Sequence, residues 1–340
     1  MTPLATMLSR WWHRAAGGLR RLVGYPRHDA SARGGRDGRD VPGAGGTSPA
    51  TAAATRPGFT AARFTHATGT RDYKLYVPAG RTDGPRPLVV MLHGCTQDPD
   101  DFAVGTRMNA LADRHGLLVL YPAQPPRSNA AKCWNWFEPR DQRRGDGEPA
   151  LLAALVRDVV GRADADPDRV HVAGLSAGGA MAAILSREYP DVFAAAAVHA
   201  GLPQGAAHDT ASAFAVMHTG RLRPGRRSRS GGPGIPTLVF HGDADRTVHP
   251  ANGQHVVDDV VADPAAQPVI RRGEAAGRPY THTVYPGRDG RPFVEHWEVH
   301  GLGHAWSGGD PRGSHTDPRG PDASHESVRF FALHRRRVPA

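Results

Sequence analysis

The chain has 340 residues, of which 39% are apolar and 22% are charged, a composition typical of a folded protein with a sizeable core. No apolar run approaches the roughly 20 residues of a membrane-spanning helix, and two cysteines exclude a disulfide-dense scaffold or a four-cysteine zinc site. The net charge of +9 is concentrated at the ends, since residues 1–45 hold eight arginines against three aspartates and residues 335–337 are all arginine. Because the body is nearly neutral, we expect no nucleic-acid partner.

Residues 1–58 are predicted to form a basic leader followed by a flexible linker. Residues 1–27 could form a short helix with Trp11 and Trp12 among arginines, of the kind that lies on a membrane surface. A poorly ordered leader is the preferred interpretation, so no membrane contact is expected. The segment lacks the apolar stretch of a standard secretory signal, and residues 28–58 have the Gly-, Ala- and Arg-rich composition of a linker.

From about residue 60 the sequence alternates between strand and helix patterns. Continuous apolar runs at 87–92 and 117–120 are typical of buried strands. Further strands are expected near Phe64 and at 73–77, 170–173, 194–198, 237–240, 282–284 and 294–299, and helices from a cap at 98–101 to about His115 and at 147–162, 177–189, 252–262 and 323–334. The Arg- and Gly-rich residues 204–234 are expected to form a mobile loop over one end of the sheet.

This alternation predicts an α/β fold with a mostly parallel sheet and helices on both of its faces. We expect one domain over residues 59–335 and a short tail at 336–340.

Residues 174–178 read GLSAG, a GxSxG motif that places a serine on a sharp strand-to-helix turn. A β-branched run enters the motif and an alanine-rich helix leaves it. Small neighbours are needed there because the serine adopts a strained backbone conformation. Ser176 is therefore predicted to be a nucleophile above the sheet, and an ordinary turn with a capping serine is the alternative.

A serine nucleophile needs a base, and the base needs an orienting acid, in the chain order Ser, Asp or Glu, His. Asp245 lies three residues beyond Gly242, past the predicted strand at 237–240, and is our candidate acid, with Asp243 as the alternative. His304 lies between glycine-containing segments of a later loop, as suits a base that reaches towards Ser176.

The spacing of His300 and His304 resembles a pair of metal ligands on a helix. Gly301 and Gly303 disfavour a helix there, and no HExxH motif occurs. We therefore expect neither a metal site nor a cofactor.

Acyl transfer also needs two backbone donors for the developing oxyanion. One is expected to be the N–H of Ala177, directly after the nucleophile. The other should come from the His93–Thr96 loop after the strand at 87–92, with the N–H of Cys95 preferred and that of Thr96 as the alternative. His93 is expected to support this loop rather than to titrate in catalysis.

Cys95 and Cys133 each lie beyond a predicted buried strand, so a disulfide between them is expected if those strands are neighbours. Two reduced thiols are the alternative. Trp134 and Trp136 follow in the same loop and are candidate substrate-binding residues, with core packing as an equally weighted alternative.

Several stretches together resemble one known family: MLHGCTQ (91–97), ADRHGLLVLYPAQ (112–124), CWNWF (133–137), AGLSAGGAMA (173–182), VFHGDADRTVHP (239–250) and GLGHAWSGGDPRGSHTDPRGPDAS (301–324). They are similar to the polyhydroxybutyrate depolymerase family of esterases, which are α/β-hydrolases related to feruloyl and acetylxylan esterases. The resemblance covers roughly residues 60–335. It implies the α/β-hydrolase fold and the triad of Ser176, Asp245 and His304.

The resemblance also implies a serine esterase that acts through an acyl-enzyme on short polyhydroxyalkanoate or hydroxybutyrate oligomers or related esters. A feruloyl or acetylxylan-type esterase is one alternative, and a non-catalytic binding protein on a hydrolase scaffold is another. Members of the family are often extracellular, which fits a disulfide, whereas the lack of a clear signal peptide favours the cytoplasm. We expect a monomer. Crystalline polymer is not an expected substrate, because polymer-degrading members of the family carry a separate substrate-binding domain and only 36 residues follow His304 here.

Overall fold

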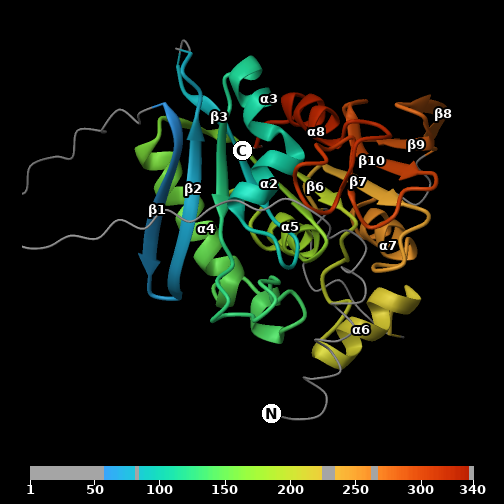
Figure 1. Cartoon of the computed structure of the whole chain (residues 1–340), viewed down its shortest axis with the longest axis horizontal. Helices are drawn as coiled ribbons and strands as arrows, with labels where there is room; N and C mark the ends of the chain where they lie inside the picture. The colour runs from blue at the N-terminus through green and yellow to red at the C-terminus, as the bar shows by residue number, and fades with distance from the viewer. Residues whose placement is uncertain (1–56, 81–83, 224–233, 262–266, 337–340) are drawn as a thin grey trace, which may run out of the picture. The chain divides into compact units, whose positions relative to one another are not determined.

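The computed structural model describes residues 57–80, 84–223, 234–261 and 267–336 (Figure 1). The strands of its main sheet are β1 (Gly58–His66), β2 (Gly69–Val77), β3 (Arg86–Leu92), β4 (Leu118–Pro122), β5 (Ala165–Leu175), β6 (Ala195–His199), β7 (Thr237–Gly242), β8 (Val269–Ala275), β9 (Arg278–Pro286) and β10 (Pro292–Val299). In the described part of the chain their order is β1-β2-β4-β3-β5-β6-β7-β10-β9-β8. The strands from β4 to β10 in this order run parallel, and two antiparallel strands flank them on each side. The predicted, mostly parallel sheet is thus confirmed.

Helices cover both faces of this sheet (Figure 1). They are α2 (Pro99–Thr106), α3 (Met108–His115), α4 (Gly147–Arg162), α5 (Ala177–Glu188), α6 (Thr210–Thr219), α7 (Ala251–Val260) and α8 (Ala323–Ala332), with a 3₁₀ turn at Pro139–Gln142. Side chains alternate along each strand, so Leu238 and Phe240 of β7 join the core cluster that contains α2, α3 and α8. Val239 between them packs instead with Ala183 of α5 and the valines of α7.

Two segments differ from the sequence predictions. The expected continuous helix up to His115 is divided into α2 and α3, because Arg107 adopts a left-handed backbone with φ 54° and interrupts the helical path. Part of the expected loop at 204–234 is the helix α6, which Asp209 and Ser212 begin with a reciprocal capping box. Residues 224–233 of that loop lie outside the described residues.

Strand β8 was not predicted from the sequence. It is an edge strand whose residues are mostly exposed, and its sequence VIRRGEA therefore lacks the apolar alternation of a half-buried strand. Its pairing with β9 extends the sheet beyond β10.

The ends of the chain lie largely outside the described residues. Of the predicted leader at 1–58, only residues 57 and 58 are described, and β1 begins at Gly58. Of the predicted tail, Arg336 is described, and its guanidinium pairs with Asp168 at 2.9 Å. Among the helices that the structure describes, none is long and apolar enough to cross a membrane.

Four of the buried histidines, His93, His171, His199 and His296, predict a loss of stability in acid. Burial lowers the pKa of His171, His199 and His296 to about 3 and that of His93 to about 4. The unfolded chain binds protons near pH 6.5, whereas the folded chain does not until the pH is far lower. The contribution of these histidines to stability should therefore be fully present above pH 6.5 and fall as the pH decreases below it, by up to about 2 kcal/mol per histidine at pH 5.

Urea unfolding at pH 7.5 and pH 5 measures this difference. The variant His296→Gln should reduce the dependence on pH, while a change at the exposed His115 should not. Equal unfolding free energies at the two pH values would contradict the prediction.

Candidate active site

Ser176 lies at the turn between β5 and α5, where the GxSxG motif predicts it. Its backbone has φ 57° and ψ −119°, a left-handed conformation that is strained for a residue with a Cβ atom. Its N–H donates to the carbonyl oxygen of His199 at the end of β6, at 2.9 Å. The turn thus fixes Ser176 at the N-terminus of a twelve-residue helix, where the helix dipole favours negative charge.

The glycines of the motif allow an unusually close approach of backbone segments. A Cβ atom on Gly178 would lie 2.1 Å from the carbonyl oxygen of Leu92 and 2.6 Å from that of His93, and one on Gly174 would lie 2.3 Å from the carbonyl oxygen of Gly178. Only glycine fits at such distances. The first turn of α5 is therefore packed directly against the loop that follows β3.

The candidate acid and base are in direct contact. Asp245, in the loop after β7, accepts a hydrogen bond of 2.7 Å through Oδ2 from His304 Nδ1, in the loop after β10. This bond leaves Nε2 of His304 as the nitrogen able to take a proton. The strands β5, β7 and β10 are parallel members of one sheet, so their carboxyl ends bring Ser176, Asp245 and His304 to the same edge.

The surroundings of Asp245 stabilise its ionised form. Its Oδ1 accepts the backbone N–H groups of Thr247 and Val248 at 2.8 and 2.9 Å. The side chain is fully buried, and Nε2 of His241 lies 3.5 Å from its Oδ2. Burial alone would raise the pKa of Asp245, but the hydrogen bonds from His241 and His304 outweigh it and hold the pKa well below its usual value.

Asp243, the alternative acid, has a different partner. Its Oδ2 lies 2.8 Å from Nδ1 of His300, and its Oδ1 accepts the N–H of Gly301 at 2.7 Å. Both side chains are more than 40% exposed. The pair ties down the start of the loop that carries His304, and it does not touch the His304 ring through any hydrogen bond in the described residues.

No hydrogen bond joins the hydroxyl of Ser176 to His304 within the described ranges. Such bonds are often long in enzymes without substrate and tighten in the complex. His199 connects the turn of Ser176 to the segment that follows His304. Its carbonyl oxygen accepts the N–H of Ser176, and its Nε2 accepts the N–H of Ser307 at 3.0 Å.

The backbone N–H groups of the loop after β3 differ in whether they already have a hydrogen-bond acceptor. The N–H of Gly94 donates to Oε1 of Gln97 at 2.9 Å, and that of Thr96 donates to the carbonyl of Ala131 at 2.7 Å. The N–H of Cys95 has no hydrogen bond to any residue that the structure describes. Of the two candidate donors, Cys95 is thus the one with an N–H available for an oxyanion.

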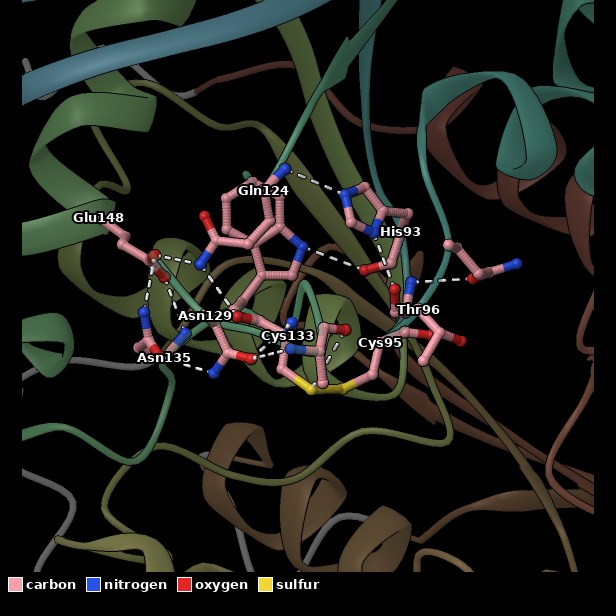
Figure 2. The surroundings of a disulfide bond; sticks show 12 residues. His93, Cys95, Thr96, Gln124, Asn129, Cys133, Asn135 and Glu148 are labelled. Carbon is pink, nitrogen blue, oxygen red and sulfur yellow. Dashed lines mark hydrogen bonds between the residues drawn. A yellow bond between two sulfur atoms is a disulfide. The ribbon is translucent and has the colours of Figure 1, made fainter. Parts of the chain in front are cut away.

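Cys95 and Cys133 form a disulfide, as the sequence predicts, across a separation of 38 residues (Figure 2). The bond joins the loop after β3 to the loop after β4. The two strands are neighbours and run parallel, which places both cysteines at the same edge of the sheet.

Reduction of this disulfide should lower both the melting temperature and kcat. Closing a loop of 38 residues contributes about 3–4 kcal/mol to stability in the chain-entropy model, and a looser loop would aim the Cys95 N–H less well. Melting curves and ester turnover with and without reductant measure both effects. Two reactive thiols per chain in the unfolded, unreduced protein would contradict the prediction.

Hydrogen bonds of His93 and Trp134 stabilise the Cys95 loop. Nδ1 of His93 donates to the carbonyl of Gly94 at 2.7 Å, and its Nε2 accepts the N–H of Gln124 at 3.1 Å, which requires a neutral ring. Trp134 is fully buried, and its Nε1 donates to the carbonyl of His93 at 3.0 Å. Trp136 is 5% exposed. These contacts favour the core-packing alternative for Trp134.

His315 is a residue near the site that the sequence interpretation missed. Its ring lies edge-on to that of His304, with 6.5 Å between the centroids. Its backbone is left-handed with φ 52°, and its carbonyl accepts the N–H of Trp306 at 2.7 Å. The sequence feature that could have indicated His315 is its place in the same glycine-rich segment as His304. Its position beside the His304 ring depends on how this segment folds back, which the sequence does not show.

The parallel sheet with antiparallel edges and the strained serine turn between β5 and α5 define an α/β-hydrolase fold. Residues 71–263 match the model of the esterase PHB depolymerase family, and the chain belongs to this family. Among solved structures, an acetyl xylan esterase from Aspergillus awamori aligns over 81% of this chain and 99% of its own, with a TM-score of 0.63 and 20% identity. That likeness shows the fold.

Curated relatives are similar over part of their length. Poly(3-hydroxyalkanoate) depolymerase C of Paucimonas lemoignei is 37% identical over 238 residues, which are 67% of this chain and 57% of the relative. Feruloyl esterase B of Neurospora crassa is 32% identical over 191 residues, 52% of this chain and 64% of the relative. The chain thus spans less than two thirds of each of these relatives.

Proposed function

We propose that the chain is a serine esterase that cleaves carboxylic esters through an acyl-enzyme. The observation that carries the proposal is the 2.7 Å hydrogen bond between Asp245 and His304, on the sheet edge where the strained turn presents Ser176. An imidazole oriented in this way through Nδ1 is the arrangement that a serine nucleophile requires.

In the proposed reaction, the hydroxyl oxygen of Ser176 attacks the ester carbonyl while Nε2 of His304 takes its proton. The N–H groups of Cys95 and Ala177 stabilise the oxyanion. Collapse of the intermediate breaks the ester bond, and His304 gives its proton to the leaving alkoxide. Water, activated by the same imidazole, then releases the acid and restores Ser176.

For the substrate, we propose short hydroxyalkanoate oligomers or related short esters. The family match and the 37% identity to a poly(3-hydroxyalkanoate) depolymerase support this choice. The 32% identity to a feruloyl esterase supports a second candidate, an esterase of plant polysaccharide. The disulfide fits an oxidising, extracellular location, which we propose for the protein.

A panel of p-nitrophenyl esters, hydroxybutyrate oligomers and methyl ferulate, assayed with one enzyme preparation, separates these candidates. Higher kcat/KM on hydroxybutyrate oligomers than on methyl ferulate is the expected result, and the opposite order would select the second candidate. Turnover of none of the esters, together with no labelling by a fluorophosphonate, would contradict the proposal and favour a binding protein on a hydrolase scaffold.

A further inference from the structure

A buried carboxylate that the proposed mechanism does not use lies to one side of the disulfide, beyond Gln124 and Asn135 (Figure 2). Glu148, in the first turn of α4, is 7% exposed. Its Oε2 accepts the backbone N–H of Asn135 at 2.8 Å, and its Oε1 accepts the side-chain amide of Asn135 at 3.1 Å. Oε1 also accepts the side-chain amide of Gln124. Both oxygens of Glu148 are therefore acceptors for groups on the loop after β4.

Two connections lead from this carboxylate to the loop of Cys95. In the first, the side-chain amide of Gln124 donates to the carbonyl of Cys133 at 2.9 Å, and the backbone N–H of Gln124 donates to His93 at 3.1 Å. In the second, Asn135 directly follows Trp134, whose indole N–H donates to the carbonyl of His93. Both connections converge on His93, two residues before Cys95, and Figure 2 shows the one from Gln124.

From this convergence we propose that Glu148 is a positioning residue, which holds the N–H of Cys95 in place for the oxyanion through Gln124 and Asn135. The inference rests on the function proposed above. Its role is to act through the backbone of the Cys95 loop, without contact to the substrate.

The charge of Glu148 supports a role in specifying geometry. Its partner Arg71 is 3% exposed, with Nη2 3.6 Å from Oε1 of Glu148. Arg71 also donates to the carbonyl of Ala123 at 3.2 Å, and its guanidinium lies 5.2 Å from the centre of the Trp134 ring. A buried ion pair adds little net stability, because desolvation offsets the attraction. The pair instead provides several directional hydrogen bonds that fix the position of the loop after β4.

Glutamine cannot reproduce this anchor. In either orientation, an amide at position 148 would turn an NH₂ group towards donors of Asn135 or Gln124 that now meet an oxygen. The loop must then shift to separate the facing donors, while the apolar core around it stays intact. Glu148→Gln should therefore change the aim of the Cys95 N–H more than it changes the fold.

The experiment compares steady-state kinetics of Glu148→Gln with those of the wild-type protein on one p-nitrophenyl ester. We expect kcat to fall about 10- to 100-fold, as for a displaced oxyanion donor, with KM changed less than about threefold. Affinity for a boronic acid, which forms a charged tetrahedral adduct with the serine, should fall in parallel with kcat/KM. Adding Asn135→Asp should recover part of kcat, because a carboxylate there accepts from the new amide.

Glu295→Gln is the matched control. Glu295 lies in β10, away from the Cys95 loop, and is 1% exposed. Its carboxylate forms hydrogen bonds with Arg329 and, at 2.9 Å, with Nε2 of His282. The substitution should lower the melting temperature and leave kcat unchanged. If Glu148→Gln does not fold, Asn135→Ala removes the side-chain hydrogen bond from Asn135 to Oε1 of Glu148 and should lower kcat in the same direction by a smaller factor, whereas an unchanged kcat would overturn the inference.

Unchanged kcat in Glu148→Gln, or an equal loss in Glu295→Gln, would overturn the inference. Fluorophosphonate labelling of the wild-type protein separates this failure from failure of the proposed function. Labelling at Ser176 together with unchanged kcat in Glu148→Gln rejects only the positioning role, whereas no labelling of Ser176 rejects the proposed esterase site as well.

Discussion

Ser176→Ala is expected to lower ester turnover by several orders of magnitude while the protein remains folded. The substitution removes the attacking oxygen, and the remaining donors supply only about 10³–10⁴-fold catalysis over water. The hydroxyl of Ser176 makes no hydrogen bond with the described residues, so its loss leaves no polar group without a partner. The left-handed backbone at φ 57° is strained to the same degree with alanine.

Ser186→Ala is the matched control for this change. Ser186 is buried in the same helix, and its hydroxyl donates to the carbonyl of Ala183 at 2.8 Å. Kinetics on a p-nitrophenyl ester and circular dichroism should show a folded, active control and a folded, inactive Ser176→Ala. Retention of more than a few per cent of activity in Ser176→Ala would mean that another serine is the nucleophile.

Asp245→Asn is expected to lower kcat on the order of 10⁴-fold. An asparagine oxygen could still accept from Nδ1 of His304, but the NH₂ group would face the other donors around this buried position. The imidazole would then lose the charge that stabilises its protonated form. The loss should be in kcat, with the melting temperature lowered as well, because Asp245 also accepts from Thr247 and Val248.

Asp243→Asn distinguishes this role from a structural one, since the two aspartates lie on the same loop. Asp243 pairs with the exposed His300, so its change should alter kcat by less than about tenfold, in keeping with the small contribution of exposed ion pairs. A large loss of kcat in Asp243→Asn together with a small one in Asp245→Asn would transfer the acid role to Asp243.

The central part of the fold was predictable because its strands are buried on both faces. Runs such as residues 87–92 are apolar throughout, which makes them visible without any partner. Helix α4 matches its predicted bounds at 147–162, since its apolar face and its first-turn proline are local signals. Strand β8 has neither property, because an exposed edge strand is defined by its hydrogen bonds to β9.

The candidate site could be predicted only in part. The chain order and the position after the strand at 237–240 predicted Ser176, Asp245 and His304, with Asp243 as the alternative acid. Only the folded chain shows that Asp243 contacts His300 and that Asp245 contacts His304, each some 60 residues away. Glu148 had no visible signal, because an acidic residue in the first turn of a helix is ordinary. Its significance arises from the side chains of Gln124 and Asn135, which only the folded chain brings to it.

The contact of Gly178 with the backbone of Leu92 and His93 has a consequence for how this sequence can vary. The backbones of two segments more than 80 positions apart lie so close together that a Cβ atom on Gly178 would overlap the carbonyl oxygens of Leu92 and His93. A larger residue at position 178 could be tolerated only if the chain after β3 were rebuilt at the same time. Single substitutions that broaden substrate choice are therefore to be sought elsewhere, for example around His315, where a ring rather than a backbone borders His304.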